Sequence, residues 1–89
     1  MNKLKDYKIS FDYKSNALEI VTPDGYCFFC HNCGLDDEGV KKSIKNIKFY
    51  PEHEMKNLLD RGIDFKTAFA KISGKQNALN ELQTVAGVI

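Results

Sequence analysis

The stretch YKISFDYKSNALEIVTPDGYCFFCH, residues 7–31, decides the fold class of this chain. Its first seven residues, 7–13, alternate between large apolar and polar side chains, which is typical of a half-buried strand. The face predicted to be buried carries Tyr7, Ile9, Phe11 and Tyr13. Residues 18–22 predict a second strand, with Leu18 and Ile20 directed toward the core.

Two turns are predicted between three strands. KSNA, residues 14–17, and PDG, residues 23–25, are rich in turn-forming residues; Pro23 presets φ and Gly25 accepts a positive φ. Short turns connect antiparallel neighbours, so we expect a β-meander. The third strand, residues 26–31, is apolar on both faces, and we therefore expect it to be covered on both sides.

Residues 35–50 allow two arrangements. In the first, Asp36 or Asp37 caps a helix with an apolar face. That face would carry Val40, Ile44 and Ile47. In the second, a short helical turn ends near Lys42 and IKNIKFY, residues 44–50, forms a fourth strand. The aromatic pair at the end of this run favours the strand.

The sequence from Pro51 onward predicts helices. Pro51 suits a first helical position, and Gly62 suits the end of that helix. The predicted core side of this helix carries Met55, Leu58 and Leu59. Asp64 is expected to cap a second helix that ends at Gly74. The apolar stripe of the second helix would consist of Phe65, Phe69 and Ile72.

A last helix is predicted near the C-terminus. Its apolar residues are Leu79, Leu82, Val85 and Ala86. Beyond them, Val88 and Ile89 form an apolar tail that we expect to serve as an interface. The predicted fold is therefore α+β: a small antiparallel sheet, with two to three C-terminal helices on one face. We expect one domain over residues 1–89, strand-rich over 1–50 and helical over 51–89.

Composition narrows the classes of function. The 89 residues carry a net charge of +1 and a single arginine, Arg61, so we expect nucleic-acid binding to be weak and purely electrostatic. Its affinity would change with log salt by a slope of at most about −3 to −4. The phosphate contacts in that case would come from Lys41, Lys42, Lys45 and Lys48. No apolar run is long enough to span a membrane, and the first residues, MNKLKDYK, do not form a signal peptide, so we expect a cytoplasmic protein.

Three cysteines form the main candidate site, with the pattern Cys27-x2-Cys30-x2-Cys33. CHNCG, residues 30–34, resembles one knuckle of a zinc ribbon, which implies a bound zinc ion. A turn could bring Cys30 and Cys33 together, and Cys27 or His53 would complete the ligand set less directly. If the strand is extended through residue 30, Cys27 and Cys30 point to opposite faces.

Two other interpretations of the cysteines stay open. They could be buried thiols without chemistry, because free cysteine is among the most buried residue types. They could also form a redox pair, because CHNC resembles the C-x2-C of thioredoxin-like proteins. Acidic residues follow this motif directly, however, and nearby negative charge disfavours the thiolate that redox chemistry needs.

No motif assembles an acid, a base and a nucleophile, so we expect a protein without catalytic activity. We expect a small binding or regulatory protein that contacts another protein, as an adaptor or inhibitor of a larger macromolecule. Phages and mobile elements encode proteins of this kind. The alternatives are a zinc-stabilised nucleic-acid-binding module and a small thiol redox protein. The apolar C-terminus also leaves room for a homo-oligomer.

Overall fold

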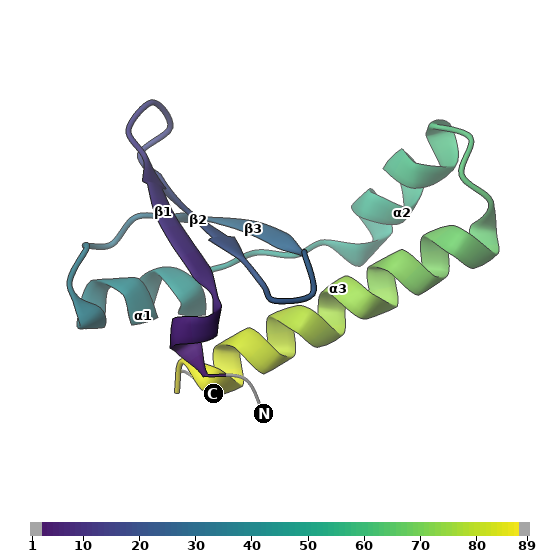
Figure 1. Cartoon of the computed structure of the whole chain (residues 1–89). Coiled ribbons are helices and arrows are strands. Elements are labelled where there is room, and N and C mark those ends of the chain that lie inside the picture. Colours follow the sequence, from purple (N-terminus) through teal and green to yellow (C-terminus); the bar gives the residue numbers. More distant parts are fainter. Residues whose placement is uncertain (1–2, 88–89) are drawn as a thin grey trace.

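The computed structural model describes residues 3–87, and these form a small α+β fold (Figure 1). A short 3-10 turn, Leu4–Asp6, precedes three strands and three helices. The strands are β1 (Lys8–Asp12), β2 (Ala17–Val21) and β3 (Cys27–His31); the helices are α1 (Asp37–Lys45), α2 (Pro51–Asp60) and α3 (Phe65–Val85). The predicted fold class is confirmed. Val88 and Ile89, predicted to form an interface, lie outside the described residues.

The sheet is an antiparallel meander in the order β1–β2–β3, as predicted. Leu18 and Ile20 of the central strand are 1% and 0% exposed, which confirms the face assigned to them. The PDG turn also forms as expected. Gly25 adopts φ +91°, and the N–H of Thr22 donates to the carbonyl of Tyr26 at 2.8 Å.

The face predicted for the first strand is only partly correct. Tyr7 is buried, but Ile9 is 36% exposed and Tyr13 is 85% exposed. Ile9 lies on an edge strand, where one flank of the side chain is open. Tyr13 lies beyond the strand, in the turn that Asp12 starts. The carboxylate of Asp12 accepts hydrogen bonds from the N–H of Lys14 at 3.0 Å and from the hydroxyl of Ser15.

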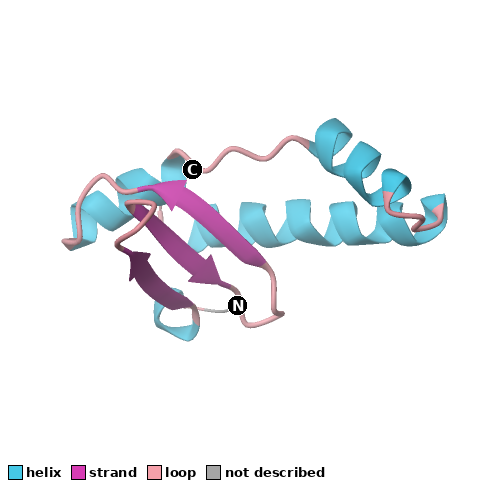
Figure 2. Ribbon diagram, turned by 90° about the horizontal axis from the view of Figure 1, so that it is seen from above, coloured by secondary structure: helices cyan, strands magenta, loops and turns pink. Residues whose placement is uncertain are grey.

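The third strand is covered on one side only, contrary to the prediction. Phe28 and Cys30 are buried, whereas Phe29 is 58% exposed on the opposite face. The reason is that α1 and α3 pack against the same face of the sheet (Figure 2). The shared core contains residues from the sheet (Leu18, Ile20, Phe28, Cys30), from α1 and the loop after it (Ile44, Ile47) and from α3 (Ala78, Leu79, Leu82, Ala86).

Residues 35–50 form a helix and a loop, so the favoured fourth strand is wrong. Asp36 caps α1 by accepting a hydrogen bond from the N–H of Gly39 at 2.9 Å. Ile44 and Ile47 are 0% and 8% exposed. Residues three apart share a helix face but point to opposite faces of a strand. Ile47 follows the end of α1, where its N–H donates to the carbonyl of Ile44 at 3.2 Å, and this last turn directs both isoleucines into the single core.

The helix ends at residues 51–64 follow local signals. Pro51 is the first residue of α2, as predicted. Gly62 follows the end of this helix with φ +84°, also as predicted. Asp64 caps α3 by accepting from the N–H of Thr67 at 3.1 Å. The predicted break at Gly74 is wrong, because α3 continues to Val85 as one helix of 21 residues.

Gly74 has a packing role inside α3. A Cβ atom at this position would occupy the space of the Tyr26 hydroxyl oxygen, so only glycine lets the ring lie against the helix. Glycine costs a helix about 1 kcal/mol relative to alanine. Flanking turns on both sides of Gly74 pack against other elements, and this packing offsets the cost.

The helical hairpin, which we define as α2 and the N-terminal half of α3, extends beyond the sheet (Figure 1). α2 packs against α3, and none of its residues is fully buried. Lys75 joins the hairpin to the rest of the molecule. Its ammonium lies 2.9 Å from the Glu54 carboxylate and 5.5 Å from the ring centroids of Phe28 and Phe49.

Candidate functional site

The three cysteines have different environments. Cys30 is buried on the inner face of the sheet, and its thiol is directed toward the carbonyl of Leu18 at 3.8 Å. Cys27 is half-buried on the outer face, where its thiol lies 3.4 Å from a carboxylate oxygen of Glu19. The prediction that Cys27 and Cys30 point to opposite faces is confirmed. The interpretation as three buried thiols holds for Cys30 alone.

The CHNCG turn is held by hydrogen bonds within the protein. The N–H of Cys33 donates to the hydroxyl of Ser43 at 2.9 Å, and the N–H of Gly34 donates to the side-chain oxygen of Asn32 at 2.9 Å. The thiol of Cys33 is exposed and lies 3.7 Å from the side-chain nitrogen of Asn46. These hydrogen bonds hold the turn in place and connect the end of β3 to α1.

His53 lies on α2, away from the strand that carries the cysteines. It lines a shallow hollow of about 720 Å³ together with Tyr50, Pro51 and Glu52. Over residues 3–87, the structure places no three His, Cys, Asp or Glu side chains so that they could share a metal ion. The predicted zinc ligands are therefore not brought together in this arrangement.

The environments of Cys27 and Cys30 disfavour the thiolate. Burial, with a smaller contribution from Cys33, raises the pKa of the Cys30 thiol from 9.0 to about 11. Burial also raises the pKa of Cys27, and the hydrogen bond to Glu19 adds to the effect. A reactive redox cysteine needs a lowered pKa and access to solvent. Neither residue provides this combination.

The raised pKa of Cys30 predicts a loss of stability at high pH. Below about pH 9 the thiol is protonated in both the folded and the unfolded chain, so its contribution is fully present. Between about pH 9 and 11 the unfolded chain releases this proton while the folded chain keeps it, which favours unfolding. We expect urea-unfolding midpoints to fall more steeply over this range in the native chain than in Cys30→Ala. Parallel curves for the two proteins would contradict the assignment, since all other titrating groups are shared.

The lysines proposed for phosphate contact are all exposed. Lys41, Lys42 and Lys45 lie on α1, and Lys48 lies in the loop that follows. The acidic residues Asp37 and Glu38 occupy the first turn of the same helix. This arrangement matches the helix dipole, which favours acids at the start and bases at the end. Lys42 and Lys45, in the last turn, thus have a structural role that needs no ligand.

The helical hairpin carries an exposed apolar surface that the sequence patterns did not predict. Leu59 is 42% exposed, Phe65 is 63% exposed and Phe69 is 58% exposed. The two phenylalanine rings stack with centroids 6.2 Å apart. Leu59 was predicted to face the core, and both phenylalanines were assigned to a buried stripe; these predictions are wrong. The i, i+4 spacing of the rings was visible in the sequence, but their exposure was not.

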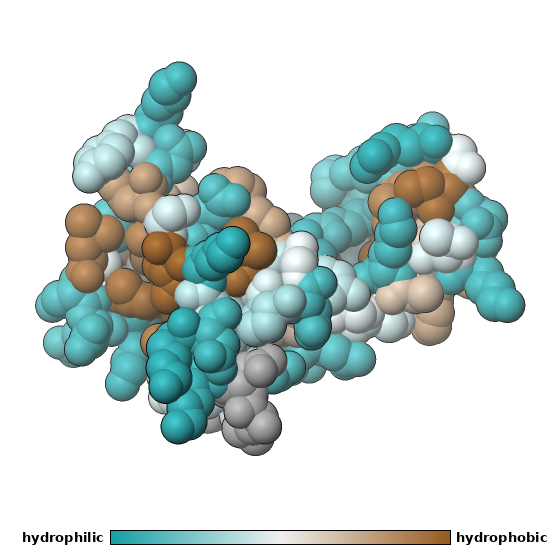
Figure 3. Space-filling view, viewed as in Figure 1, coloured by the Kyte–Doolittle hydropathy of each residue, from teal (hydrophilic) through white to brown (hydrophobic). Residues whose placement is uncertain are grey.

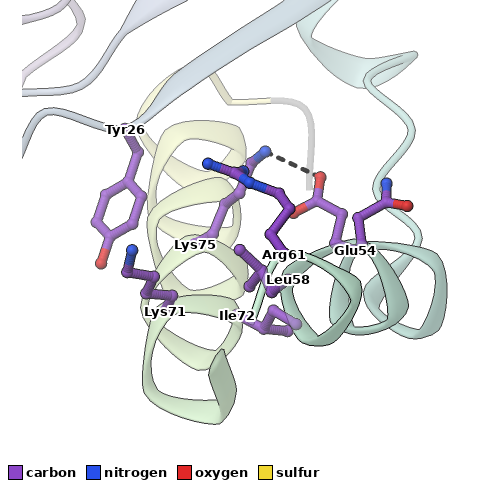
Figure 4. A pocket seen from close by; sticks show the side chains of 8 residues that line it. Tyr26, Glu54, Leu58, Arg61, Lys71, Ile72 and Lys75 are labelled. Atoms are coloured by element: carbon purple, nitrogen blue, oxygen red, sulfur yellow. Dashed lines mark hydrogen bonds and ion pairs between the residues drawn. The ribbon is translucent and has the colours of Figure 1, made fainter. Parts of the chain in front are cut away.

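A cleft with a volume of about 580 Å³ lies between α2, α3 and the β2–β3 turn (Figure 4). Its lining comes from the β2–β3 turn (Tyr26), from α2 and its C-terminal cap (Glu54, Asn57, Leu58, Arg61) and from α3 (Lys71, Ile72, Lys75). On α2 the periodicity of 3.6 residues turns Leu59 away from this cleft, whereas on α3 Phe65 and Phe69 share a stripe with Ile72 but lie nearer the start of the helix and do not line the cleft. We define the hairpin apolar side as Met55, Leu59, Phe65 and Phe69.

The hydropathy of the surface is uneven. Figure 3 shows apolar side chains gathered in two places on one face, over the sheet and over the outer end of the hairpin, with polar side chains between them. No helix among the described residues is both long and apolar enough to cross a membrane. Isolated apolar side chains on a surface are normal, whereas grouped ones mark contact surfaces.

Comparisons with protein-family models, with curated proteins and with solved structures find no match for this chain.

Proposed function

We propose that this is a non-catalytic binding protein that acts by protein–protein contact, as an adaptor or inhibitor of a larger macromolecule. The observation that carries this proposal is the stacked pair Phe65 and Phe69, more than half exposed on a hairpin that extends from the sheet. The absence of a recognisable catalytic motif in the sequence supports the same class of function.

The energetics of the aromatic pair favour contact with a partner. Covering a large apolar side chain contributes roughly 1.5–3 kcal/mol, so leaving two phenylalanines in water forgoes a gain comparable to a large part of a small domain's stability. Aromatic side chains also dominate the binding energy of many protein interfaces. Phe65 and Phe69, four residues apart on one helix, match the anchor spacing by which helices occupy grooves.

The position of the pair makes it accessible to a groove. The N-terminal half of α3 contacts α2 and extends past the sheet, so the apolar side of the hairpin is not shielded by the strands (Figure 1). Leu59 extends this surface onto the second helix. A partner with an apolar groove could cover residues from both helices in a single contact.

The test is capture of a partner from an extract of the source cells, with the immobilised chain and two matched variants. We expect Phe65→Ser/Phe69→Ser to retain at least about tenfold less of a specific protein, because each aromatic contact is worth at least about 1 kcal/mol. Lys56→Ser/Lys66→Ser changes two exposed residues of the same helices and should retain the protein fully.

Both variants should fold, since the substituted side chains are solvent-exposed, and circular dichroism checks this. Equal retention by the phenylalanine variant would exclude the hairpin apolar side as the contact surface. An extract that yields no protein dependent on the phenylalanines, at any chain concentration used, would overturn the proposed function. Sedimentation velocity of the purified chain shows whether the captured partner is instead a second copy.

A further inference from the structure

Tyr26 forms one wall of the cleft between α2, α3 and the β2–β3 turn. Tyr26 closes the turn, with its N–H donating to the Thr22 hydroxyl at 3.0 Å and its carbonyl accepting from the Thr22 N–H at 2.8 Å. Its hydroxyl lies in the space that any side chain at Gly74 would need. The sequence thus accepts a helix-destabilising glycine in the middle of α3, and the result is an aromatic wall at a defined position.

The floor of the cleft is apolar and its rim is charged. Ile72 is 8% exposed and, with Leu58, forms the apolar part of the lining. Figure 4 shows Tyr26 and Lys71 on one side of the space and Arg61 with Glu54 on the other. The single arginine of the chain is therefore placed here, on a different element from the lysine that faces it.

The charges of the cleft do not balance. Three cations, Arg61, Lys71 and Lys75, face one carboxylate, that of Glu54, which leaves a formal excess of +2. Lys75 is engaged by Glu54 at 2.9 Å. For Arg61 and Lys71 the described residues provide no ion pair, although both line the same space as the apolar floor.

We propose that this cleft binds a small phosphate monoester with an aromatic or apolar body. A phosphate monoester carries a charge of about −1.5 to −2 near pH 7, which matches the two cations that lack a partner better than a monocarboxylate does. The guanidinium of Arg61 can donate two parallel hydrogen bonds to phosphate oxygens, and Lys71 adds a point charge. The organic body would lie against Leu58, Ile72 and Tyr26. A volume of about 580 Å³ is typical of small-molecule sites.

The lining of this cleft includes no residue of the hairpin apolar side, so the two proposed sites consist of different residues. A substitution in one set of residues therefore tests one proposal without changing a side chain of the other. Failure of one proposal would leave the other standing, and the two experiments report on different residues.

The test is an NMR titration of the isotope-labelled chain with phenyl phosphate in about 150 mM salt, which screens non-specific attraction. We expect saturable shifts at the amides of Tyr26, Leu58 and Ile72. Inorganic phosphate lacks the ring and benzoate lacks the second charge, so both should bind at least about fivefold more weakly. Arg61→Gln and Lys71→Gln should each weaken phenyl phosphate binding about tenfold, the value expected for one charge-assisted hydrogen bond.

Matched control variants distinguish a specific binding site from non-specific attraction of the phosphate group to any cation. Lys66→Gln removes an exposed charge from the same helix outside the cleft and should change the affinity by less than about twofold. Arg61→Lys keeps the charge but loses the paired donors, so it should fall between the native chain and Arg61→Gln. Dissociation constants above about 10 mM for phenyl phosphate, equal losses in Lys66→Gln, or shifts centred away from the cleft would each overturn the proposal.

Discussion

Deletion of residues 79–89 should leave a chain that no longer folds. Leu79 and Leu82 are 5% and 0% exposed and form the helical side of the single core. Burial of two leucines contributes roughly 3–6 kcal/mol, and the deletion also uncovers their partners on the sheet, Leu18 and Ile20. A chain of this size has a total stability of roughly 5–9 kcal/mol, so the loss is as large as the stability itself.

The measurement is thermal unfolding followed by circular dichroism, together with the dispersion of amide signals in NMR. The truncated chain should show no cooperative transition and poorly dispersed signals. The matched control removes only residues 88–89, which lie outside the described part of the chain, and should keep the transition. A cooperative transition in the longer deletion would mean that the sheet and α1 form a core without α3.

The second large effect is expected for Gly39→Ala. A Cβ atom at position 39 would lie 2.6 Å from the Cα, the carbonyl carbon and the carbonyl oxygen of Gly34. Backbone atoms cannot rotate away as a side chain can, so α1 must shift from the turn it packs against. That shift would strain the hydrogen bonds of Ser43, whose hydroxyl accepts from the N–H of Cys33 and donates to the carbonyl of Gly39, both at 2.9 Å.

Helix propensity acts in the opposite direction, since alanine is favoured over glycine by roughly 0.5–1 kcal/mol. Overpacking costs about 1–3 kcal/mol, and a fixed backbone neighbour places this site at the upper end of that range. We therefore expect a net loss of about 2 kcal/mol and a Tm lower by about 10 °C. Lys41→Ala, an exposed change in the same helix, should stay within about 0.5 kcal/mol of the native chain. A Gly39→Ala variant as stable as this control would show that α1 is not held tightly against Gly34.

The candidate site was only partly accessible from the sequence. The alternation of a strand placed Cys27 and Cys30 on opposite faces, and the structure confirms this. The pairing of Cys30 with Cys33 as metal ligands rested on a five-residue resemblance, and in the structure one thiol is buried and the other exposed. A short motif does not specify where α1 lies, and Ser43 on that helix holds the turn.

The exposure of Phe65 and Phe69 shows the limit of periodicity. The spacing of apolar residues predicts which side chains share a helix face, but not whether another element covers that face. Here the sheet covers only the C-terminal half of α3, and α2 is too short and too polar to enclose the other half. The exposed surface that supports the proposed function therefore depends on how the elements pack, which the spacing of apolar residues does not specify.

The sequence by itself determined the features that depend on a few neighbouring residues. The alternation of Leu18 and Ile20, the turn at Gly25 and the cap at Asp64 were all predicted and all form, and Asp36 is one of the two caps that the sequence left open for α1. The physical reason is that backbone sterics and hydrogen bonds to the nearest N–H groups decide them within a span of three to five residues.

Tertiary structure alone decided the features that depend on a distant segment. Gly74 lies inside a helix and packs against Tyr26, 48 positions earlier in the chain, and residues 44–47 form a helix end and a loop instead of a strand because one core buries both isoleucines. Local propensity differs between such alternatives by about 1 kcal/mol, whereas burial of a single large side chain contributes roughly 1.5–3 kcal/mol. Packing therefore overrides local preference wherever the two disagree.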